Sequence, residues 1–216
     1  MPHLTDKQRQ RIIIRHRNSI SRYGYTPNAL FWSSREIQYK RFEVLIRVME
    51  IFPGAVAPPS ILDVGCGFGD LWSYCDDRGI DVDYHGIDLS PDMVESAGYQ
   101  HPGIKAGQGD IFDLDPQPLS HDFVFLSGAL NEVVDEPPAK KGDYARATIS
   151  RMYQACRCAT AFNLLDARHE WTASRPDLQS FDPGEILGYC REFADEVQIV
   201  EGYLDNDFTV YLIRKR

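Results

Sequence analysis

Three glycines at alternate positions follow an aspartate in the stretch ILDVGCGFGDL, residues 61–71. Gly65, Gly67 and Gly69 permit a tight turn and a close backbone approach to a ligand, because glycine has no Cβ atom and accepts positive φ angles. A helix that begins after such a loop offers free backbone N–H groups to a ligand with negative charge or lone pairs. The loop therefore predicts a binding site for a nucleotide-like cofactor.

The spacing of the glycines separates two candidate cofactors. The dinucleotide fingerprint has the form G-x-G-x-x-G, and its third glycine would fall at position 70, where the chain has Asp70. A carboxylate at the start of the helix would repel a pyrophosphate. The actual G-x-G-x-G pattern, with Asp63 two residues upstream, instead suits S-adenosylmethionine, whose sulfonium amino acid is positively charged and has no pyrophosphate.

With these residues the chain resembles the class I S-adenosylmethionine-dependent methyltransferases, whose first motif has the form D-x-G-x-G-x-G. Asp63, Gly65, Gly67 and Gly69 match that motif, and Cys66 is a small residue within the loop. The resemblance implies that the loop backbone lines the methionine part of the cofactor and that the acidic residue fixes its amino group. It extends from about residue 60 to the C-terminus.

Two further motifs of this family follow in order. Asp88 comes at the spacing of about 20 residues after the glycines that is typical of a ribose-binding acid, and its two oxygens can accept hydrogen bonds from both ribose hydroxyls. The resemblance implies that Asp110 takes the adenine amino group, with Ile111 beside the ring. Leu89 and Met93 are expected on the other side of the ring.

The methyl acceptor is expected at the ends of two later strands. In this family it binds at the loop SGALNEV, residues 127–133. We expect Ser127 to meet the methionine end of the cofactor, and Asn131, Glu132 and the later Asp166 to contact the acceptor. The N-P-P-Y-like tetrad of the members that methylate amino groups of DNA bases is missing, and the catalytic residues stay unassigned.

The aromatic segment YGYTPNALFW, residues 23–32, lies where N-terminal additions in this family cover the cofactor. The resemblance makes Tyr25 and Trp32 candidates for acceptor contacts, and it makes Arg41 a candidate partner of the cofactor's carboxylate. Packing of the N-terminal helices onto the core explains the same residues equally well.

Short apolar runs alternate with amphipathic segments from residue 60 onward. Strands are expected at 60–64, 82–87, 104–107, 122–126, 160–164, 197–200 and 208–213. The last two are too close for a crossover helix and must pair as a hairpin. We predict a doubly wound, mostly parallel seven-stranded α/β sheet, closed by an antiparallel last strand that gives it a distinctive edge. Residues 58–216 would form this Rossmann-like domain.

Residues 1–57 are expected to form an N-terminal helical cap. A first helix is predicted over 5–23. A second would begin at a capping box of Ser33 and Glu36 and continue through Phe52. The segment PGAVAPP, residues 53–59, would end it.

The composition and charge of the chain limit the kinds of ligand that it is expected to bind. The chain has 216 residues, 43% hydrophobic content and a formal net charge of −9, which argues against a surface built to bind nucleic-acid phosphates. Residues 1–23 nevertheless hold six Lys or Arg side chains and one Asp. This basic segment predicts either a helix docked on its own acidic domain or an arm for an anionic substrate or RNA.

The remaining features indicate a cytoplasmic protein without a metal site. The sequence contains no run of about 18 apolar residues, and the five cysteines and six histidines show no metal-ligand spacing. We expect the cysteines to be reduced. The oligomeric state stays open.

The resemblance predicts an enzyme that moves a methyl group from S-adenosylmethionine to an O or N atom of a small-molecule acceptor. Alternatives are an RNA methyltransferase that uses the basic arm, a non-catalytic S-adenosylmethionine-binding module, an aminopropyl transferase and an NAD oxidoreductase.

Overall fold

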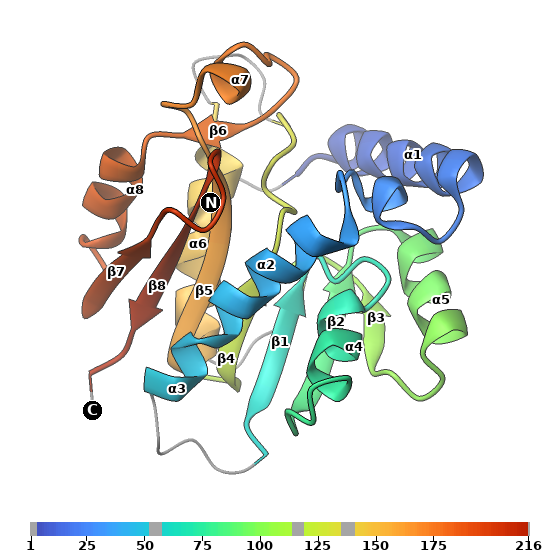
Figure 1. The fold of residues 1–216 in the computed structure, drawn as a ribbon, viewed down its shortest axis with the longest axis horizontal. Helices are drawn as coiled ribbons and strands as arrows, with labels where there is room; N and C mark the ends of the chain where they lie inside the picture. Colours follow the sequence, from blue (N-terminus) through green and yellow to red (C-terminus); the bar gives the residue numbers. More distant parts are fainter. Residues whose placement is uncertain (1–3, 52–57, 114–118, 135–140, 216) are drawn as a thin grey trace.

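The computed structural model describes residues 4–51, 58–113, 119–134 and 141–215. It contains one sheet with the strand order β3-β2-β1-β4-β5-β8-β7, and β6 pairs with β5 beside this path (Figure 1). The strands are β1 Ser60–Val64, β2 Asp83–Asp88, β3 Ala106–Gln108, β4 His121–Leu126, β5 Cys156–Asp166, β6 Ser180–Phe181, β7 Glu196–Val200 and β8 Asp207–Ile213. Only β8 runs antiparallel to its neighbours, which confirms the predicted sheet with a reversed last strand.

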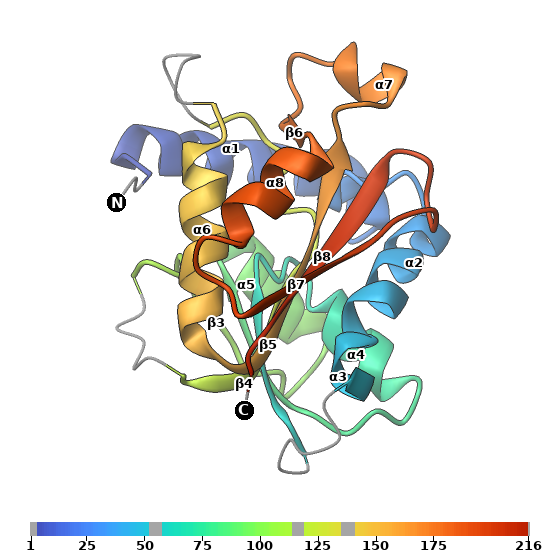
Figure 2. The ribbon, with the colours of Figure 1, turned by 90° about the vertical axis from the view of Figure 1, so that its left-hand side faces the viewer.

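Helices cover both faces of the sheet, as Figure 2 shows for α6 and α8 on one side and α2 and α4 on the other. The helices are α1 Asp6–Tyr23, the 3₁₀ helix η1 Pro27–Leu30, α2 Arg35–Ile46, α3 Val48–Ile51, α4 Asp70–Asp76, α5 Pro91–Gln100, α6 Asp143–Ala155, α7 Glu170–Ala173 and α8 Pro183–Cys190. Successive strand residues point to opposite faces: Leu62 joins the core under α6, whereas Ile61 joins the core under α2 and α4.

Three local predictions need correction. The N-cap of α2 is Ser34, not Ser33, because the Ser34 side chain accepts the Ile37 N–H. The expected long helix is two helices that meet at Arg47, and Phe52 and residues 53–57 lie outside the described residues. Strand β8 lies between β5 and β7, so the reversed strand is internal and not at the sheet edge. The two-residue strand β6 was not predicted, because it is too short to show a pattern.

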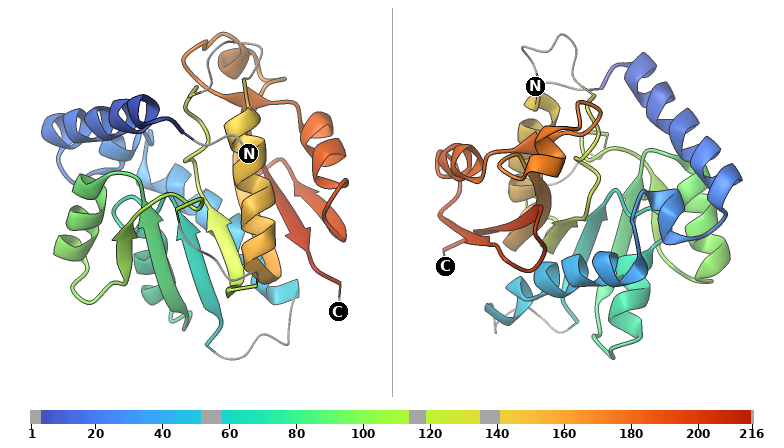
Figure 3. Two further views of the ribbon diagram at one scale, coloured as in Figure 1. Left: turned by 180° about the vertical axis from the view of Figure 1, so that it is seen from behind. Right: turned by 45° about the horizontal axis from the view of Figure 1, so that its top comes forward.

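The basic helix α1 docks on the acidic body of the same chain. Arg9 donates two hydrogen bonds to Asp113, at 2.6 and 2.9 Å, and Arg15 Nη1 lies 2.7 Å from a Glu132 oxygen. Arg17 forms an ion pair with an aspartate of α5 at 3.1 Å. In the left-hand view of Figure 3, α1 (blue) lies at the upper left, next to α5. Of the two interpretations of the basic segment, the structure shows the self-docked helix.

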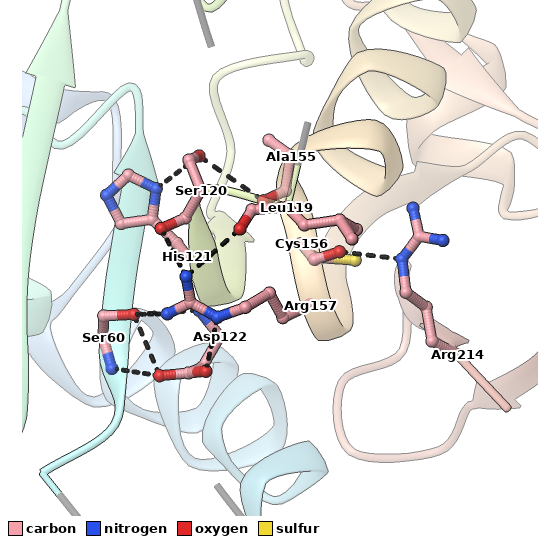
Figure 4. A network of polar contacts seen from close by, with 9 residues as sticks. All are labelled: Ser60, Leu119, Ser120, His121, Asp122, Ala155, Cys156, Arg157 and Arg214. Atoms are coloured by element: carbon pink, nitrogen blue, oxygen red, sulfur yellow. Dashed lines mark hydrogen bonds and ion pairs between the residues drawn. The ribbon is translucent and has the colours of Figure 1, made fainter. Parts of the chain in front are cut away.

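A polar network ties the amino ends of the central strands together (Figure 4). The Asp122 carboxylate at the start of β4 accepts hydrogen bonds from the Ser60 backbone N–H at 2.8 Å and from Arg157 Nε at 2.9 Å. Arg157 also donates to the backbone carbonyls of Leu119 and Ser120. These bonds fix β1, β4 and β5 relative to one another at the end opposite the glycine loop. No described helix is both long and apolar enough to span a membrane.

Candidate active site

A cavity of about 810 Å³ lies at the carboxyl ends of β1, β2 and β4. Strands β2 and β3 extend the sheet on one side of β1, whereas β4 and β5 extend it on the other, so the strand order reverses at β1. Ligands of open α/β sheets bind at such a switch point. The right-hand view of Figure 3 brings this edge forward, with α1 and η1 beside it. The volume lies within the range of small-molecule sites, about 300–1,000 Å³.

The structure brings most of the predicted site residues to this cavity. Its lining includes Asp63, Gly65, Cys66, Gly67, Asp88, Leu89, Met93, Asp110, Ile111, Ser127, Arg41, Trp32, Asn131 and Glu132. Three predicted residues lie outside the lining. Gly69 is the N-cap of α4, Tyr25 packs edge-on against the Phe68 ring, and Asp166 forms an ion pair with Arg168.

The glycine loop is held by backbone bonds and by close contacts that exclude side chains. Gly65, Gly67 and Gly69 all have positive φ angles, between 54° and 78°. A Cβ atom on Gly65 would lie 2.4 Å from the Ala129 Cβ, and one on Gly67 would lie 2.9 Å from the Leu30 side chain. The loop therefore packs directly between the loop after β4 and the helix η1.

Asp63 lies next to the last residue of β1 and is 3% exposed. Its Oδ2 accepts a hydrogen bond from the Tyr84 hydroxyl at 2.7 Å. Burial raises the pKa of Asp63 to about 7, the Tyr84 hydrogen bond lowers it, and the nearby Asp88 and Asp70 raise it. No basic side chain of the described residues stabilises the charged form.

Asp88 at the end of β2 is oriented by two backbone amides. Its Oδ2 accepts from the Gly67 N–H at 3.0 Å and its Oδ1 from the Ser90 N–H at 2.9 Å. A carboxylate oxygen has two lone pairs, so each oxygen can accept one more hydrogen bond, as two ribose hydroxyls require. His16 of α1 lies 3.9 Å from Oδ1 and lines the cavity. The sequence patterns gave no signal for His16.

Asp110 reaches the cavity with its carboxylate already bonded to the protein. Oδ1 accepts from the Phe112 N–H at 3.2 Å and Oδ2 from the Tyr144 hydroxyl at 2.9 Å. Arg9 of α1 lies 3.5 Å from Oδ2. Burial raises the pKa of Asp110, and these three neighbours oppose that effect. The contact between Asp110 and the adenine amino group stays a prediction.

Arg41 lies at the other end of the cavity and is 4% exposed. Its Nε and Nη2 donate to Asp207 at the start of β8, with an Nη2–Oδ1 distance of 2.8 Å. The guanidinium carbon lies 4.4 Å above the Trp32 ring, and Nη1 has no hydrogen-bond partner among the described residues. A guanidinium fixed by one carboxylate and one ring retains a donor for a second carboxylate.

The predicted acceptor region joins two loops. Glu132 pairs with Leu178 in an isolated β-bridge, and the Gln179 N–H donates to the Asn131 carbonyl at 2.9 Å. The side-chain oxygens of Asn131 and Gln179 are buried and have no hydrogen-bond partner in the described structure. Sequence reasoning missed Gln179, because its segment carries no recognisable pattern.

The Cys66 thiol lines the cavity but is not suited to act as a nucleophile. The residue is buried in the glycine loop, and burial raises the pKa of its thiol well above the usual value, with Asp88 and Asp63 adding to the effect. A thiol that stays protonated is a weak nucleophile. The structure thus favours a packing role for Cys66 in the loop, and its predicted contact with the cofactor stays a prediction.

Comparison with known proteins agrees with the motifs. Residues 61–157 match the model of a family described as "Methyltransferase domain". The Mycobacterium tuberculosis protein Rv1506c, whose name places it among the methyltransferases, is 32% identical over 162 residues, which cover 74% of this chain and 96% of that protein. Trans-aconitate 2-methyltransferase of Mycobacterium sp. (strain KMS) is 36% identical over 161 residues, 71% of this chain and 59% of that protein.

Solved structures show the same fold. A SAM-dependent methyltransferase from Archaeoglobus fulgidus superposes with a TM-score of 0.61 at 14% identity, covering 84% of this chain and 95% of that one. Three ordered motifs, the sheet with its reversed β8 and the relatives all agree. The chain therefore belongs to the class I S-adenosylmethionine-dependent methyltransferases.

Proposed function

We propose that this methyltransferase transfers the methyl group to an O or N atom of a small molecule. The observation that carries this proposal is the shape of the site. The cavity of about 810 Å³ is lined on its outer side by α1, η1 and the segment after α7, including His16, Leu30 and Leu178. Such a site encloses a nucleoside and a small acceptor, and it excludes water that would compete for the reaction.

The charges of the cavity fit S-adenosylmethionine. Most ionised side chains of the lining are neutralised by another residue, as Arg15 is by Glu132, Arg41 by Asp207 and Arg175 by Asp177. Asp63 has no such partner among the described residues, and the ion-pair partner of Asp88 among them is His16 at 3.9 Å. Two carboxylates left at the glycine loop favour a ligand with a cationic group and hydroxyl donors.

Each end of the cofactor has a residue suited to hold it. Asp63 would bind the ammonium group, Asp88 the ribose hydroxyls, and Arg41 Nη1 the carboxylate. When bound, the cofactor supplies a methyl group on a sulfonium whose positive charge disappears in the transfer. The chain's part is to align the acceptor with that methyl group, since correct orientation accounts for much of the acceleration of such a displacement. Leu30 packs against Gly67 and Trp32 against Gly128, where both would help to exclude water.

Organic acids are the first acceptors to test. One relative named above is a trans-aconitate 2-methyltransferase, and the chain spans 59% of the length of that protein. A carboxylate acceptor needs no general base, because it is already an anionic nucleophile.

The test combines binding and turnover. Calorimetric titration with S-adenosylhomocysteine should show binding, and release of that product should require an added acceptor such as trans-aconitate or a related di- or tricarboxylate. Release with RNA and with no small molecule would contradict the proposal. The RNA alternative loses its main support because Arg9, Arg15 and Arg17 are bonded within the chain.

A further inference from the structure

A buried hydrogen bond lies beneath the cofactor site, on the sheet face covered by α2 and α4. Tyr84 of β2 donates its hydroxyl to Asp63 Oδ2 of β1 at 2.7 Å, and both residues are 3% exposed. We propose that Tyr84 is a positioning residue that holds the Asp63 carboxylate in place and in its charged form for the ammonium group of the cofactor. The inference rests on the cofactor site proposed above.

The strand register shows that β2 leaves space for this bond. Tyr84 lies opposite Ile61, and Gly86 lies opposite Asp63. The tyrosine side chain therefore extends along the strand, past the position of Gly86, to reach the carboxylate. A Cβ atom on Gly86 would lie 3.0 Å from the Tyr84 hydroxyl and 2.9 Å from the Cys66 Cβ. Any larger residue at position 86 would push the hydroxyl away from Asp63.

Other groups around Asp63 oppose its charge. Asp88 at the end of β2 and Asp70 of α4 both raise the pKa of Asp63. Asp70 is itself bonded to Arg35 and Gln38 of α2.

The neighbouring thiols stay neutral, because burial raises the pKa values of Cys66 and Cys75. Among the described groups that act on Asp63, Tyr84 alone favours the carboxylate. Burial raises the pKa of Tyr84 well above its usual value, so it remains a donor.

The effect of the Tyr84 hydroxyl can be measured separately from the packing of its ring. The Tyr84 ring belongs to the apolar cluster with Ile61, Leu71 and Phe125, and a phenylalanine would fill the same space. Tyr84→Phe therefore removes the hydrogen bond and leaves the shape. Tyr211→Phe is the matched control, because Tyr211 lies in the same cluster and donates its hydroxyl to the Val44 carbonyl, away from Asp63.

The experiment is a calorimetric titration of each protein with S-adenosylhomocysteine between pH 6 and 8.5. Because Asp63 has a pKa of about 7 in the free protein, wild-type affinity should rise with a midpoint near that pH. Loss of a hydrogen bond to a charged group should raise the pKa of Asp63 by roughly one unit or more. Tyr84→Phe should therefore bind about 5-fold more weakly than wild type at pH 7 and nearly equally at pH 8.5.

Controls separate the possible outcomes. Tyr211→Phe should follow the wild-type pH profile, and 5′-methylthioadenosine, which lacks the amino group, should bind wild type and Tyr84→Phe equally. Gly86→Ala should move the midpoint in the same direction as Tyr84→Phe, which gives a second variant if the first is unstable. A Tyr84→Phe midpoint equal to that of wild type, or an equal loss at every pH, would overturn the inference. A wild-type protein that binds no S-adenosylhomocysteine at any pH would refute the proposed function as well.

Discussion

Each end of the central strands holds a buried aspartate, and the pKa values of the two aspartates are shifted in opposite directions. At the amino end, Asp122 accepts hydrogen bonds from Ser60 and Arg157. Burial works to raise its pKa, but these partners outweigh burial and hold the pKa below the usual value. At the carboxyl end, Asp63 has one neutral donor, Tyr84, and a pKa raised to about 7 by burial.

The difference indicates which end of the sheet is built for stability and which for a ligand. A buried carboxylate with a cationic partner strengthens the fold at neutral pH, whereas one without such a partner weakens it. Figure 4 shows the completed network at the amino end. We propose that the carboxyl end lacks a cationic partner for Asp63 because the cofactor's ammonium group takes that place, at the expense of stability in the free protein.

The largest expected effect is on the stability of Asp63→Asn. Because the folded-state pKa of about 7 exceeds the unfolded value near 3.9, the free wild-type protein loses stability as pH rises between these values. Asparagine stays neutral, so the variant should gain up to about 4 kcal/mol of unfolding free energy relative to wild type at pH 8. The gain should nearly vanish at pH 4. Urea unfolding at both pH values measures it, and an equal difference at both would contradict the comparison.

The next effect is on cofactor affinity. Asp88→Ala removes two acceptor oxygens, and hydrogen bonds to charged groups are worth roughly 1.5–3 kcal/mol each, so affinity for S-adenosylhomocysteine should fall by at least about 100-fold. Because the sugar is common to both ligands, affinity for 5′-methylthioadenosine should fall equally. Calorimetry measures both, with thermal unfolding as the check on folding. Unchanged affinity would show that the carboxyl end is not the nucleoside site.

At the amino end the expected effects reverse. Asp122→Asn weakens the bonds to Arg157 and Ser60 and should lower the unfolding free energy by about 2 kcal/mol at pH 7. Affinity for S-adenosylhomocysteine should stay within about 2-fold of wild type, since the network lies at the opposite end of the strands. A large loss of affinity at unchanged stability would erase the distinction between the two ends.

The smallest effect is expected at the surface. Arg17→Ala breaks an ion pair with Asp92 that is 3.1 Å long and whose arginine side chain is 58% exposed. Exposed pairs contribute between about 0 and 1 kcal/mol, so stability should change by about 0.5 kcal/mol or less. Chemical unfolding at low and high salt measures it. A change above about 2 kcal/mol would mean that α1 is held mainly by this contact.

The sequence predicted the features that depend on local pattern. The glycine loop and Asp88 at a strand end are each visible within a few residues, because turns and strands use local chemistry. The Arg41 and Asp207 pair joins positions 166 residues apart, and no local pattern encodes it. The Tyr84 bond depends on strand register, which appears only when β1 and β2 are aligned.

The central claim is that the carboxyl end keeps a carboxylate for the cofactor's ammonium group. Calorimetric titration of the wild-type protein with S-adenosylhomocysteine at pH 7, in buffers of different ionisation enthalpy, counts the protons exchanged on binding. A residue with a pKa of about 7 that becomes fully charged in the complex should release about half a proton per ligand. Asp63→Asn should abolish this release. Binding to the wild-type protein with no proton released would contradict the claim.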